Sequence, residues 1–399
     1  MKRTLVPRME PYATSIFGEM STIAAETGAI NLGQGFPDTD GPEEIKLVAR
    51  AAIAEGKGNQ YPPVHGLPDL RAAIAEHQER FYGLRVDPAT DVVVTTGASE
   101  AIQSALLALC DSGDEVVVFE PWFDIYAVGI ALANATRVSV PLRPPAFRPD
   151  IDALRAAITD RTRLLLLNSP HNPTGVVFTR EELQEIADLA IERDLIVISD
   201  EAYEHLWYDG YPHVPIATLP GMAERTVTIG SAGKSFSFTG WKVGWATGPT
   251  DLIRAVRAVR QHLSFVSGGP FQYAIAHALR MPDSYFEDFR HGLQSQRDIL
   301  TTGLRELGFS AVESEGTYFL TTDLGPLSDY PDALTAAREL PHRAGVVAIP
   351  LQVFCDHAGV GESSLRWAYC KRPEVLRQAL EAAPGQTDAL TNLGHVLMG

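Results

Sequence analysis

The sequence predicts an α/β fold: a three-layer α/β/α arrangement with a mostly parallel, seven-stranded sheet, plus a smaller α+β domain. Short runs rich in Val, Leu and Ile alternate with amphipathic helical segments between residues 92 and 247. These runs are continuously apolar, which is typical of strands buried on both faces. After residue 250, long helical stretches precede a mixed tail, which indicates a second, smaller unit.

Each predicted strand is a short β-branched or leucine-rich run. The seven runs span residues 92–95, 116–119, 137–140, 164–167, 195–199, 226–229 and 243–247. Helices are predicted between several of them, for example over 98–110 and 179–193. The second begins with Thr179 and Glu182, a capping box that satisfies free N–H groups at a helix start. Because parallel strands need long crossovers, this alternation favours a largely parallel sheet covered by helices on both faces.

The rest of the chain does not follow this alternation. Helical stretches at 250–262, 270–281 and 284–307 precede strands predicted near 317–321, 345–348 and 365–369. The first 45 residues are rich in Gly and Pro around residue 35 and fit no strand–helix unit. We therefore expect four segments: an N-terminal arm contributing to the small domain (1–45), a large cofactor-binding domain (46–295), a small C-terminal domain (296–383) and a tail without assigned role (384–399).

Composition excludes several classes of protein. The 399 residues include 33 Lys and Arg against 50 Asp and Glu, giving a net charge of −17, which disfavours general binding to nucleic acid or to anionic membranes. Three cysteines cannot form a disulfide framework and suit a reducing compartment. We find no signal-peptide core at the N-terminus and no apolar run of about 18 residues. We expect a cytoplasmic protein that acts on small molecules, with no metal site.

Polar groups follow four of the predicted strands. Thr96-Gly97-Ala98-Ser99 comes after the first strand and opens a helix, whose free N–H groups suit an anion. Asn172 follows the strand at 164–167, and Asp200 and Tyr203 follow the next. Lys234 comes after the strand at 226–229 and is one of only six lysines. Ligands of open parallel sheets bind beyond the carboxyl ends of the strands, so we expect these groups to share one site.

Each of these features has a structural explanation when taken singly, such as a helix cap, a turn or a solvated lysine. A P-loop ATPase is a further alternative, because Gly233-Lys234-Ser235 resembles the end of a phosphate loop. That motif requires Gly at position 228, where the sequence has Thr228. The ATPase interpretation is therefore rejected, whereas complementary groups at successive strand ends favour a shared site.

The ordered motifs resemble those of fold-type I, class I/II aminotransferases, which use pyridoxal 5′-phosphate. The motifs are Thr-Gly-Ala-Ser, Asn-Ser-Pro-His-Asn-Pro-Thr-Gly, Ser-Asp-Glu-Ala-Tyr, Ser-Ala-Gly-Lys-Ser-Phe and Gly-Trp-Lys-Val-Gly-Trp. Gly-Gln-Gly-Phe-Pro near residue 35, Asn-Gln-Tyr-Pro-Pro at 59–63 and Leu-Arg-Trp-Ala near 366 extend the resemblance over almost the whole chain. Within the class, the chain is most similar to the kynurenine/glutamine/methionine branch, especially to actinobacterial N-succinyldiaminopimelate aminotransferases.

This resemblance implies roles for the groups at the strand ends. Lys234 is expected to bind the cofactor covalently and then to act as the base that moves the substrate proton. Asp200 is expected to pair with the pyridine nitrogen and keep it protonated. Tyr203 and Asn172 are expected to hydrogen-bond the phenolic oxygen of the cofactor ring.

The resemblance also implies how the remaining parts of the cofactor are bound. An aromatic side chain should stack on the ring; Phe123 is our choice, with Trp122 as the alternative. The phosphate is expected to bind at the turn before the first helix of the sheet, with a hydroxyl and a charge from later strands. The expected phosphate-binding residues are Gly97, Ala98, Ser99, Ser231 and Lys242.

Substrate and partner contacts are implied in the same way. Arg366 is expected to bind the substrate α-carboxylate with its fork of donors, and Asn172 and a Gly35 N–H to lie close to the same substrate. In this family Tyr61 reaches the phosphate of the neighbouring subunit, which implies a homodimer with shared active sites.

The expected reaction transfers an amino group between an amino acid and 2-oxoglutarate by a ping-pong mechanism. A small, Gly-rich stretch at 264–269 suggests a roomy pocket and favours N-succinyl-LL-diaminopimelate, in a lysine-biosynthesis role. Broad kynurenine, glutamine and methionine specificity is the main alternative, and a carbon–sulfur β-lyase on the same scaffold is another. A pyridoxal-phosphate-sensing regulator is disfavoured, because the motifs begin near residue 31 and the net charge is wrong for DNA.

Overall fold

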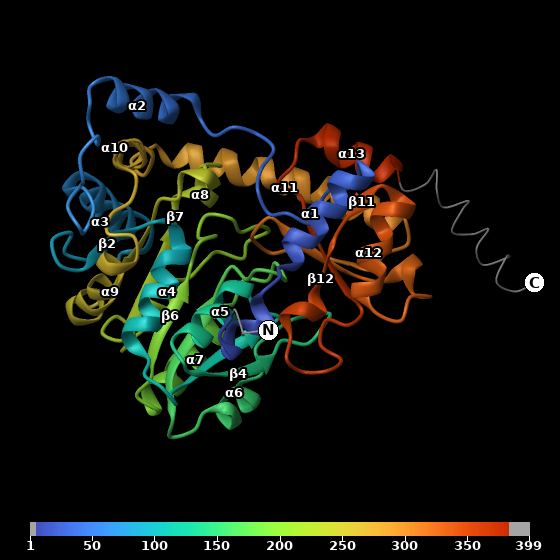
Figure 1. Cartoon of the computed structure of the whole chain (residues 1–399), viewed down its shortest axis with the longest axis horizontal. Coiled ribbons are helices and arrows are strands. Elements are labelled where there is room, and N and C mark those ends of the chain that lie inside the picture. The colour runs from blue at the N-terminus through green and yellow to red at the C-terminus, as the bar shows by residue number, and fades with distance from the viewer. Residues whose placement is uncertain (1–4, 383–399) are drawn as a thin grey trace, which may run out of the picture.

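A seven-stranded sheet forms the centre of the larger part of the molecule in the computed structural model, which describes residues 5–382 (Figure 1). Its strand order is β2-β8-β7-β6-β5-β3-β4. The strands are β2 (Val92–Thr95), β3 (Glu115–Glu120), β4 (Thr136–Pro141), β5 (Thr162–Asn168), β6 (Ile196–Asp200), β7 (Thr226–Ser231) and β8 (Gly244–Thr247). β8 runs antiparallel to both β2 and β7, and the other pairings are parallel. The mostly parallel seven-stranded sheet predicted from the sequence is confirmed.

Helices cover both faces of this sheet. They are α2 (Glu43–Ala54), α3 (Pro68–Tyr82), α4 (Gly97–Leu109), α5 (Asp124–Leu132), α6 (Ile151–Ala157), α7 (Arg180–Glu192), α8 (Ala232–Ser235), α9 (Thr250–Leu263) and α10 (Gly269–Ala278). The predicted capping box begins α7: Thr179 Oγ1 accepts from the Glu182 N–H at 3.2 Å, and Glu182 Oε2 accepts from the Thr179 N–H at 2.8 Å.

The alternation of side chains along β2 shows how the two faces are filled. Val93 packs into the main core with α4 residues, whereas Val92 and Val94 pack into a second core with α2, α3 and α10. Because successive side chains of a strand point to opposite faces, one short apolar run supplies both cores. Continuous burial on both faces is the physical reason why these strands are apolar at every position.

The smaller unit is an α+β arrangement, as predicted. Its four-stranded sheet has the order β12-β13-β10-β9. The strands are β9 (Ala311–Val312), β10 (Phe319–Asp323), β12 (Ile349–Pro350) and β13 (Ser364–Ala368), and a separate pair joins β1 (Ile30–Asn31) to β11 (Val346–Val347). The helices are α1 (Ile16–Thr27), α11 (Asp283–Glu306), α12 (Ala333–Ala344) and α13 (Pro373–Ala382). The shorter 3₁₀ helices of the chain are Pro7–Tyr12, Ile216–Thr218, Thr239–Trp241, Gly325–Leu327 and Leu351–Phe354.

The N-terminal segment packs against the C-terminal third of the chain. Figure 1 shows α1, in blue, beside the orange α12, and these two helices are in contact. β1 pairs with β11 in parallel, which joins residues 30–31 to residues 346–347. The predicted tail at 384–399 lies outside the described residues. None of the helices within residues 5–382 combines the length and apolar character needed to cross a membrane.

Candidate active site

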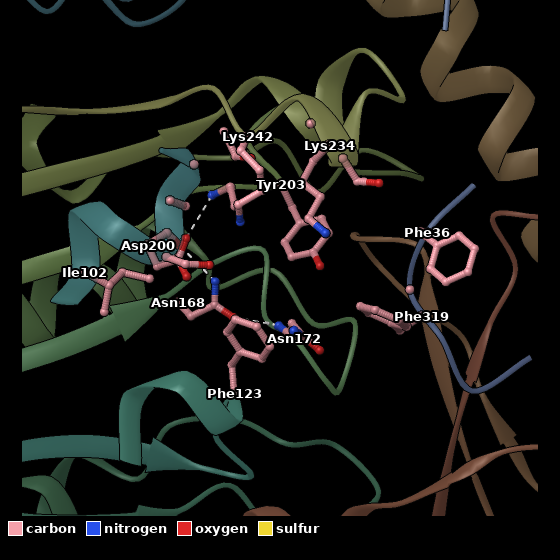
Figure 2. A pocket seen from close by; sticks show the side chains of 18 of the residues that line it. Phe36, Ile102, Phe123, Asn168, Asn172, Asp200, Tyr203, Lys234, Lys242 and Phe319 are labelled. Carbon is pink, nitrogen blue, oxygen red and sulfur yellow. Dashed lines mark hydrogen bonds between the residues drawn. The ribbon is translucent and has the colours of Figure 1, made fainter. Parts of the chain in front are cut away.

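A cavity of about 300 Å³ lies at the carboxyl ends of β5, β6 and β7, where the larger part meets the smaller unit. Figure 2 shows side chains from several elements converging on it, with Lys234 and Asp200 on the sheet side and Phe319 on the small-unit side. Nearly all of the residues predicted from the sequence line it. They are Gly35, Gly97, Ala98, Ser99, Phe123, Asn172, Asp200, Tyr203, Ser231, Lys234, Lys242 and Arg366.

Three expectations concern residues that do not line this cavity. Tyr61 is not among the lining residues; its side chain is 80% exposed and its ring meets that of Phe265 edge-on at 5.2 Å. None of residues 264–269 lines the cavity either. Within one chain this Gly-rich stretch therefore lies outside the cavity, because Ser264 and Phe265 lie beside Thr96 and Tyr61. Trp122, the alternative to Phe123, is buried in the core and does not line the cavity.

The turn that opens α4 has the geometry of an anion site. Gly97 has a φ of +74°, which favours glycine, and a Cβ there would lie 3.1 Å from the Lys242 ammonium. Gly244 on β8 lies against the same turn, where a Cβ would come within 2.5 Å of the Gly97 carbonyl carbon. No side chain caps this helix start, and the N–H groups of Ala98 and Ser99 have no partner within the helix. The turn thus presents free donors beside a cation.

Asp200, at the end of β6, is a buried carboxylate held by neutral donors. Its Oδ2 accepts from the Tyr126 hydroxyl at 2.6 Å and its Oδ1 from the Ala202 N–H at 3.1 Å. Its backbone carbonyl accepts from Asn168 Nδ2 at 2.8 Å. Burial raises the pKa of Asp200 above its usual value, while the Tyr126 hydrogen bond and the Lys234 charge oppose the shift. A cationic group in the cavity would offset this desolvation.

Two buried contacts hold the loop that carries Tyr203. Glu201 Oε2 is hydrogen-bonded to His213 Nε2 at 2.8 Å, and His205 Nε2 lies 2.8 Å from His77 Nε2 on α3. Burial lowers the pKa of His77 to about 3, so the imidazole is neutral and the pair forms a hydrogen bond without charge repulsion. These contacts hold the residues two positions before and two positions after Tyr203.

Lys234 occupies the short helix α8, directly after β7. Its Nζ donates to the Tyr318 hydroxyl at 2.8 Å, and that hydroxyl donates to the Gly35 carbonyl. Burial lowers the pKa of Lys234 to about 8, and the nearby charges of Lys242 and Arg366 act in the same direction. A minor fraction of the amine is therefore neutral at pH 7 and about half of it at pH 8, and the neutral amine is the state that a nucleophile or base requires.

Arg366, on β13, reaches the cavity from the smaller unit. Its Nη1 donates to Asn172 Oδ1 at 3.1 Å and its Nη2 to the Gly33 carbonyl at 2.6 Å. The guanidinium lies 4.0 Å from the centroid of the Phe319 ring and is only 2% exposed. Within the described chain it forms no ion pair, its Nε has no partner, and burial lowers its pKa to about 10. A buried guanidinium without a carboxylate is suited to bind an anionic ligand.

Close packing at Gly35 brings the N-terminal segment against this arginine site. A Cβ at Gly35 would lie 2.3 Å from Phe319 Cζ, so no larger residue fits there without rearrangement. The requirement for glycine thus comes from a contact between segments nearly three hundred positions apart in the sequence.

Five aromatic residues of the site were not identified as site residues from the sequence. Tyr126 is three positions after Phe123, on the first turn of α5, and this spacing is the only sequence signal that could have found it. The others come from the N-terminal segment or the smaller unit and belong to none of the motifs at the strand ends. These are Phe17, Phe36, Tyr318 and Phe319.

Comparison with known proteins gives a consistent family. The family model described as "Aminotransferase class I and II" matches residues 27–382. The chain is 49% identical over 386 residues to a "Probable N-succinyldiaminopimelate aminotransferase DapC" from Mycobacterium tuberculosis, covering 94% of this chain and 96% of the relative. It is 37% identical over 379 residues to a "Methionine aminotransferase" from Escherichia coli, covering 94% and 97%.

Solved structures agree with these relatives. The structure of N-succinyldiaminopimelate aminotransferase from Mycobacterium tuberculosis has a TM-score of 0.92 and 50% identity, covering 95% of this chain and 98% of that one. The structure of YbdL from Escherichia coli, described with a methionine aminotransferase function, has a TM-score of 0.90 and 37% identity, covering 95% and 99%.

The lowered pKa of Lys234 predicts a pH-dependent gain in stability when this amine is removed. Below about pH 8 the amine is protonated in both the folded and the unfolded chain, so the fold bears the full cost of the buried charge. That cost disappears as the pH rises from about 8 towards the usual lysine pKa of 10.5. Without bound ligand, Lys234→Met should therefore be more stable than the native chain at pH 7, by up to about 3 kcal/mol.

Urea unfolding of both ligand-free proteins at pH 7 and pH 9.5 measures this difference. The advantage of Lys234→Met should shrink at the higher pH. Lys46→Met is the control, because Lys46 forms surface ion pairs with Asp40 and Glu43 and should give no gain at pH 7. An advantage of equal size at both pH values would contradict the proposed cost of the buried charge.

Proposed function

This chain belongs to the class I and II aminotransferase family, and we propose that it transfers the amino group of N-succinyl-LL-diaminopimelate to 2-oxoglutarate by a ping-pong mechanism. Members of the fold-type I aminotransferases use pyridoxal 5′-phosphate, so the enzyme is a pyridoxal-phosphate-dependent aminotransferase. The substrates and the kinetic order are the parts that we propose.

The donor set of the cavity fits this cofactor. Free N–H groups at the start of α4 and the Lys242 ammonium suit a phosphate dianion. Asp200 supplies a buried carboxylate without a cationic partner in contact, and Lys234 supplies an amine held partly neutral. When bound, pyridoxal 5′-phosphate supplies an electron sink that stabilises the charge left on the substrate once its α-hydrogen is removed.

We assign the proton transfer to Lys234. The residue would hold the cofactor covalently at rest; once released, its amine would accept the α-proton of the substrate and deliver it to the C4′ carbon of the cofactor. Tyr318 supports this role, because its hydroxyl accepts a hydrogen bond from Nζ and would hold the free amine in the cavity. The pKa near 8 supports it as well, since a general base works best when its pKa lies near the operating pH.

Asp200, Tyr203 and Asn172 would orient the cofactor ring. Asp200 would hold a proton on the ring nitrogen, and Tyr126 keeps its carboxylate directed into the cavity. Tyr203 and Asn172 would donate to the phenolic oxygen on the opposite side. Phe123 lines the cavity, and its ring centroid lies 5.7 Å from that of Tyr126, the residue that donates to Asp200. The Phe123 side chain would cover one face of the cofactor ring.

The phosphate would bind to the α4 turn of Gly97, Ala98 and Ser99, with Ser231 and Lys242 completing the site. Tyr61 of a second copy would reach the same phosphate, so we propose a homodimer with shared active sites. The exposure of Tyr61, Leu263 and Phe265, large apolar side chains on one surface, supports this proposal.

Arg366 would bind the α-carboxylate common to all amino and oxo acid substrates. The aminotransferase assignment of these residues rests on one observation. The buried guanidinium of Arg366 has no ion-pair partner in the described chain and lies in the same cavity as the amine of Lys234. Asn172 already accepts from Nη1 and would share the same carboxylate, and the N–H of Gly35 would approach it from the N-terminal segment.

The substrate proposal rests mainly on similarity. The Mycobacterium tuberculosis relative, named as a probable N-succinyldiaminopimelate aminotransferase, is 49% identical over nearly its whole length. Broad specificity is the second candidate, favoured by relatives named as methionine and kynurenine aminotransferases at 37% and 36% identity. A β-lyase would use the same residues up to proton removal and then expel a leaving group from the β-carbon.

The first prediction concerns which lysine binds the cofactor. Lys234→Ala should bind pyridoxal 5′-phosphate without a covalent link and lose turnover, because no other amine replaces the base. Borohydride reduction of the native holoenzyme followed by peptide mapping should label Lys234. Lys242, the other lysine of the cavity, is the internal comparison, and labelling there would disprove the assignment.

A second prediction concerns the α-carboxylate. Arg366→Ala should weaken every amino acid and oxo acid by a similar amount, about 2–5 kcal/mol in kcat/KM, because the lost contact is common to all of them. The ratio of kcat/KM between two donors should hardly change. A loss confined to one substrate would instead place Arg366 against the distal side chain.

A third prediction tests the substrate. Values of kcat/KM are compared for N-succinyl-LL-diaminopimelate, methionine, kynurenine and glutamine with 2-oxoglutarate as acceptor. The succinylated donor should exceed the others. If methionine or kynurenine exceeds it by tenfold, equal to about 1.4 kcal/mol of transition-state binding, the lysine-pathway assignment is wrong while the aminotransferase assignment stands.

A further inference from the structure

One wall of the cavity comes from a segment without regular secondary structure. Residues 33–38 lie between β1 and α2, and Gln34, Gly35 and Phe36 all line the cavity. Figure 2 shows Phe36 on this separate segment, on the small-unit side near Phe319. The Phe36 side chain is 46% exposed, so packing alone leaves much of the ring free.

Side chains of the smaller unit hold this segment by its carbonyl groups. Arg366 Nη2 donates to the Gly33 carbonyl at 2.6 Å, the Tyr318 hydroxyl donates to that of Gly35, and Lys371 Nζ donates to that of Phe36 at 2.8 Å. Arg366 and Tyr318 also contact other groups of the site. Among the described contacts, Lys371 makes none with those groups, and it does not line the cavity.

Lys371 is an unusual lysine in its environment. It is 6% exposed, and within residues 5–382 the structure records no ion pair for it. Its ammonium lies 4.4 Å from the centroid of the Phe36 ring, in the range of a cation–π interaction. A buried ammonium is costly unless the surrounding groups compensate the charge, and here both compensating groups belong to Phe36.

We propose that Lys371 is a positioning residue that fixes Phe36, and through it the wall of the cavity that faces the substrate side chain. The inference rests on the proposed function in one respect, namely that this cavity receives the substrate. The carbonyl hydrogen bond fixes the backbone of the segment, and the cation–π contact fixes the orientation of the ring. Two contacts to one residue determine both its position and its direction.

Lys371 therefore affects binding more than proton transfer. The base, Lys234, is held by Tyr318, and the carboxylate of Asp200 is held by Tyr126, so neither group is in direct hydrogen-bond contact with Phe36. Loss of the ammonium would free the ring and remove one of the three carbonyl contacts from the smaller unit to a segment that has no regular secondary structure. The bound substrate would lose a preformed wall, which raises KM without a matching loss of kcat.

Steady-state kinetics of Lys371→Met holoenzyme tests this role with the amino donor that the native enzyme uses best. KM should rise at least fivefold while kcat stays within twofold. Lys371→Arg, which keeps a charged donor, should recover part of the KM. Lys46→Met, which removes a surface lysine, should leave both parameters unchanged. An unchanged KM in Lys371→Met would overturn the proposal. A fall in kcat as large as the rise in KM, in both Lys371 variants, would overturn it as well.

A double-mutant cycle tests whether Lys371 acts through Phe36. Phe36→Leu removes the ring, so adding Lys371→Met to it should raise KM by much less than Lys371→Met does alone. Full additivity would show that Lys371 acts elsewhere and would overturn the proposal. If Lys371→Met fails to fold, Lys371→Gln takes its place, because it removes the charge and keeps a hydrogen-bond donor.

A binding measurement provides a readout apart from turnover. α-Methyl-L-glutamate has no α-hydrogen to lose, and its dissociation constant follows from the change in cofactor absorbance. The constant should rise with Lys371→Met as KM does, while the thermal unfolding temperature of the holoenzyme and the bound-cofactor spectrum stay close to native. Failure of the native enzyme to use N-succinyl-LL-diaminopimelate would disprove the substrate assignment only, since the role of Lys371 is measured with the donor that is used.

Discussion

The guanidinium of Arg366 joins three parts of the chain that are far apart in the sequence. It extends from β13 of the smaller unit, donates to Asn172 from the loop after β5 of the large sheet, and donates to the Gly33 carbonyl of the N-terminal segment. Phe319 covers its face. Because the guanidinium is buried without a carboxylate partner in the described chain, these contacts offset only part of its desolvation. The geometry of the cavity depends on keeping this cation in place and leaving it able to bind an anion.

The other charges of the cavity follow the same principle. Lys234 and Asp200 are withdrawn from water, and each is held by a tyrosine hydroxyl rather than by an opposite charge in contact. Burial shifts the pKa of both towards the neutral form. A site arranged in this way is poised to exchange protons and to bind a charged cofactor, whereas fully paired charges would be inert. The neutral tyrosines position these groups without neutralising them.

The sequence was a good guide to the large sheet and to the groups at its strand ends. All seven strands are present, and Asn172, Asp200 and Lys234 meet in one cavity because parallel strands end at one edge. The sequence was a poor guide to contacts made by residues outside the large sheet and its strand ends. Tyr318 and Phe36 belong to no motif at the strand ends, and four strands of the smaller unit have only two residues each and leave no periodic pattern. The Gly-rich stretch at 264–269 does not line the cavity of its own chain, because composition alone does not say which surface a segment faces.

The sequence by itself determined the layered α/β fold, the set of chemical groups and the family, because strand burial and strand-end motifs are local properties that a chain carries in its residue order. The tertiary structure decided which of these groups are unpaired, how far each pKa moves and what fills the wall opposite the base. Those properties depend on contacts such as Lys371 with Phe36 and Tyr126 with Asp200, whose partners are separated by many residues and brought together by packing. Desolvation and hydrogen-bond geometry arise only when the folded chain excludes water, so residue order alone does not specify them.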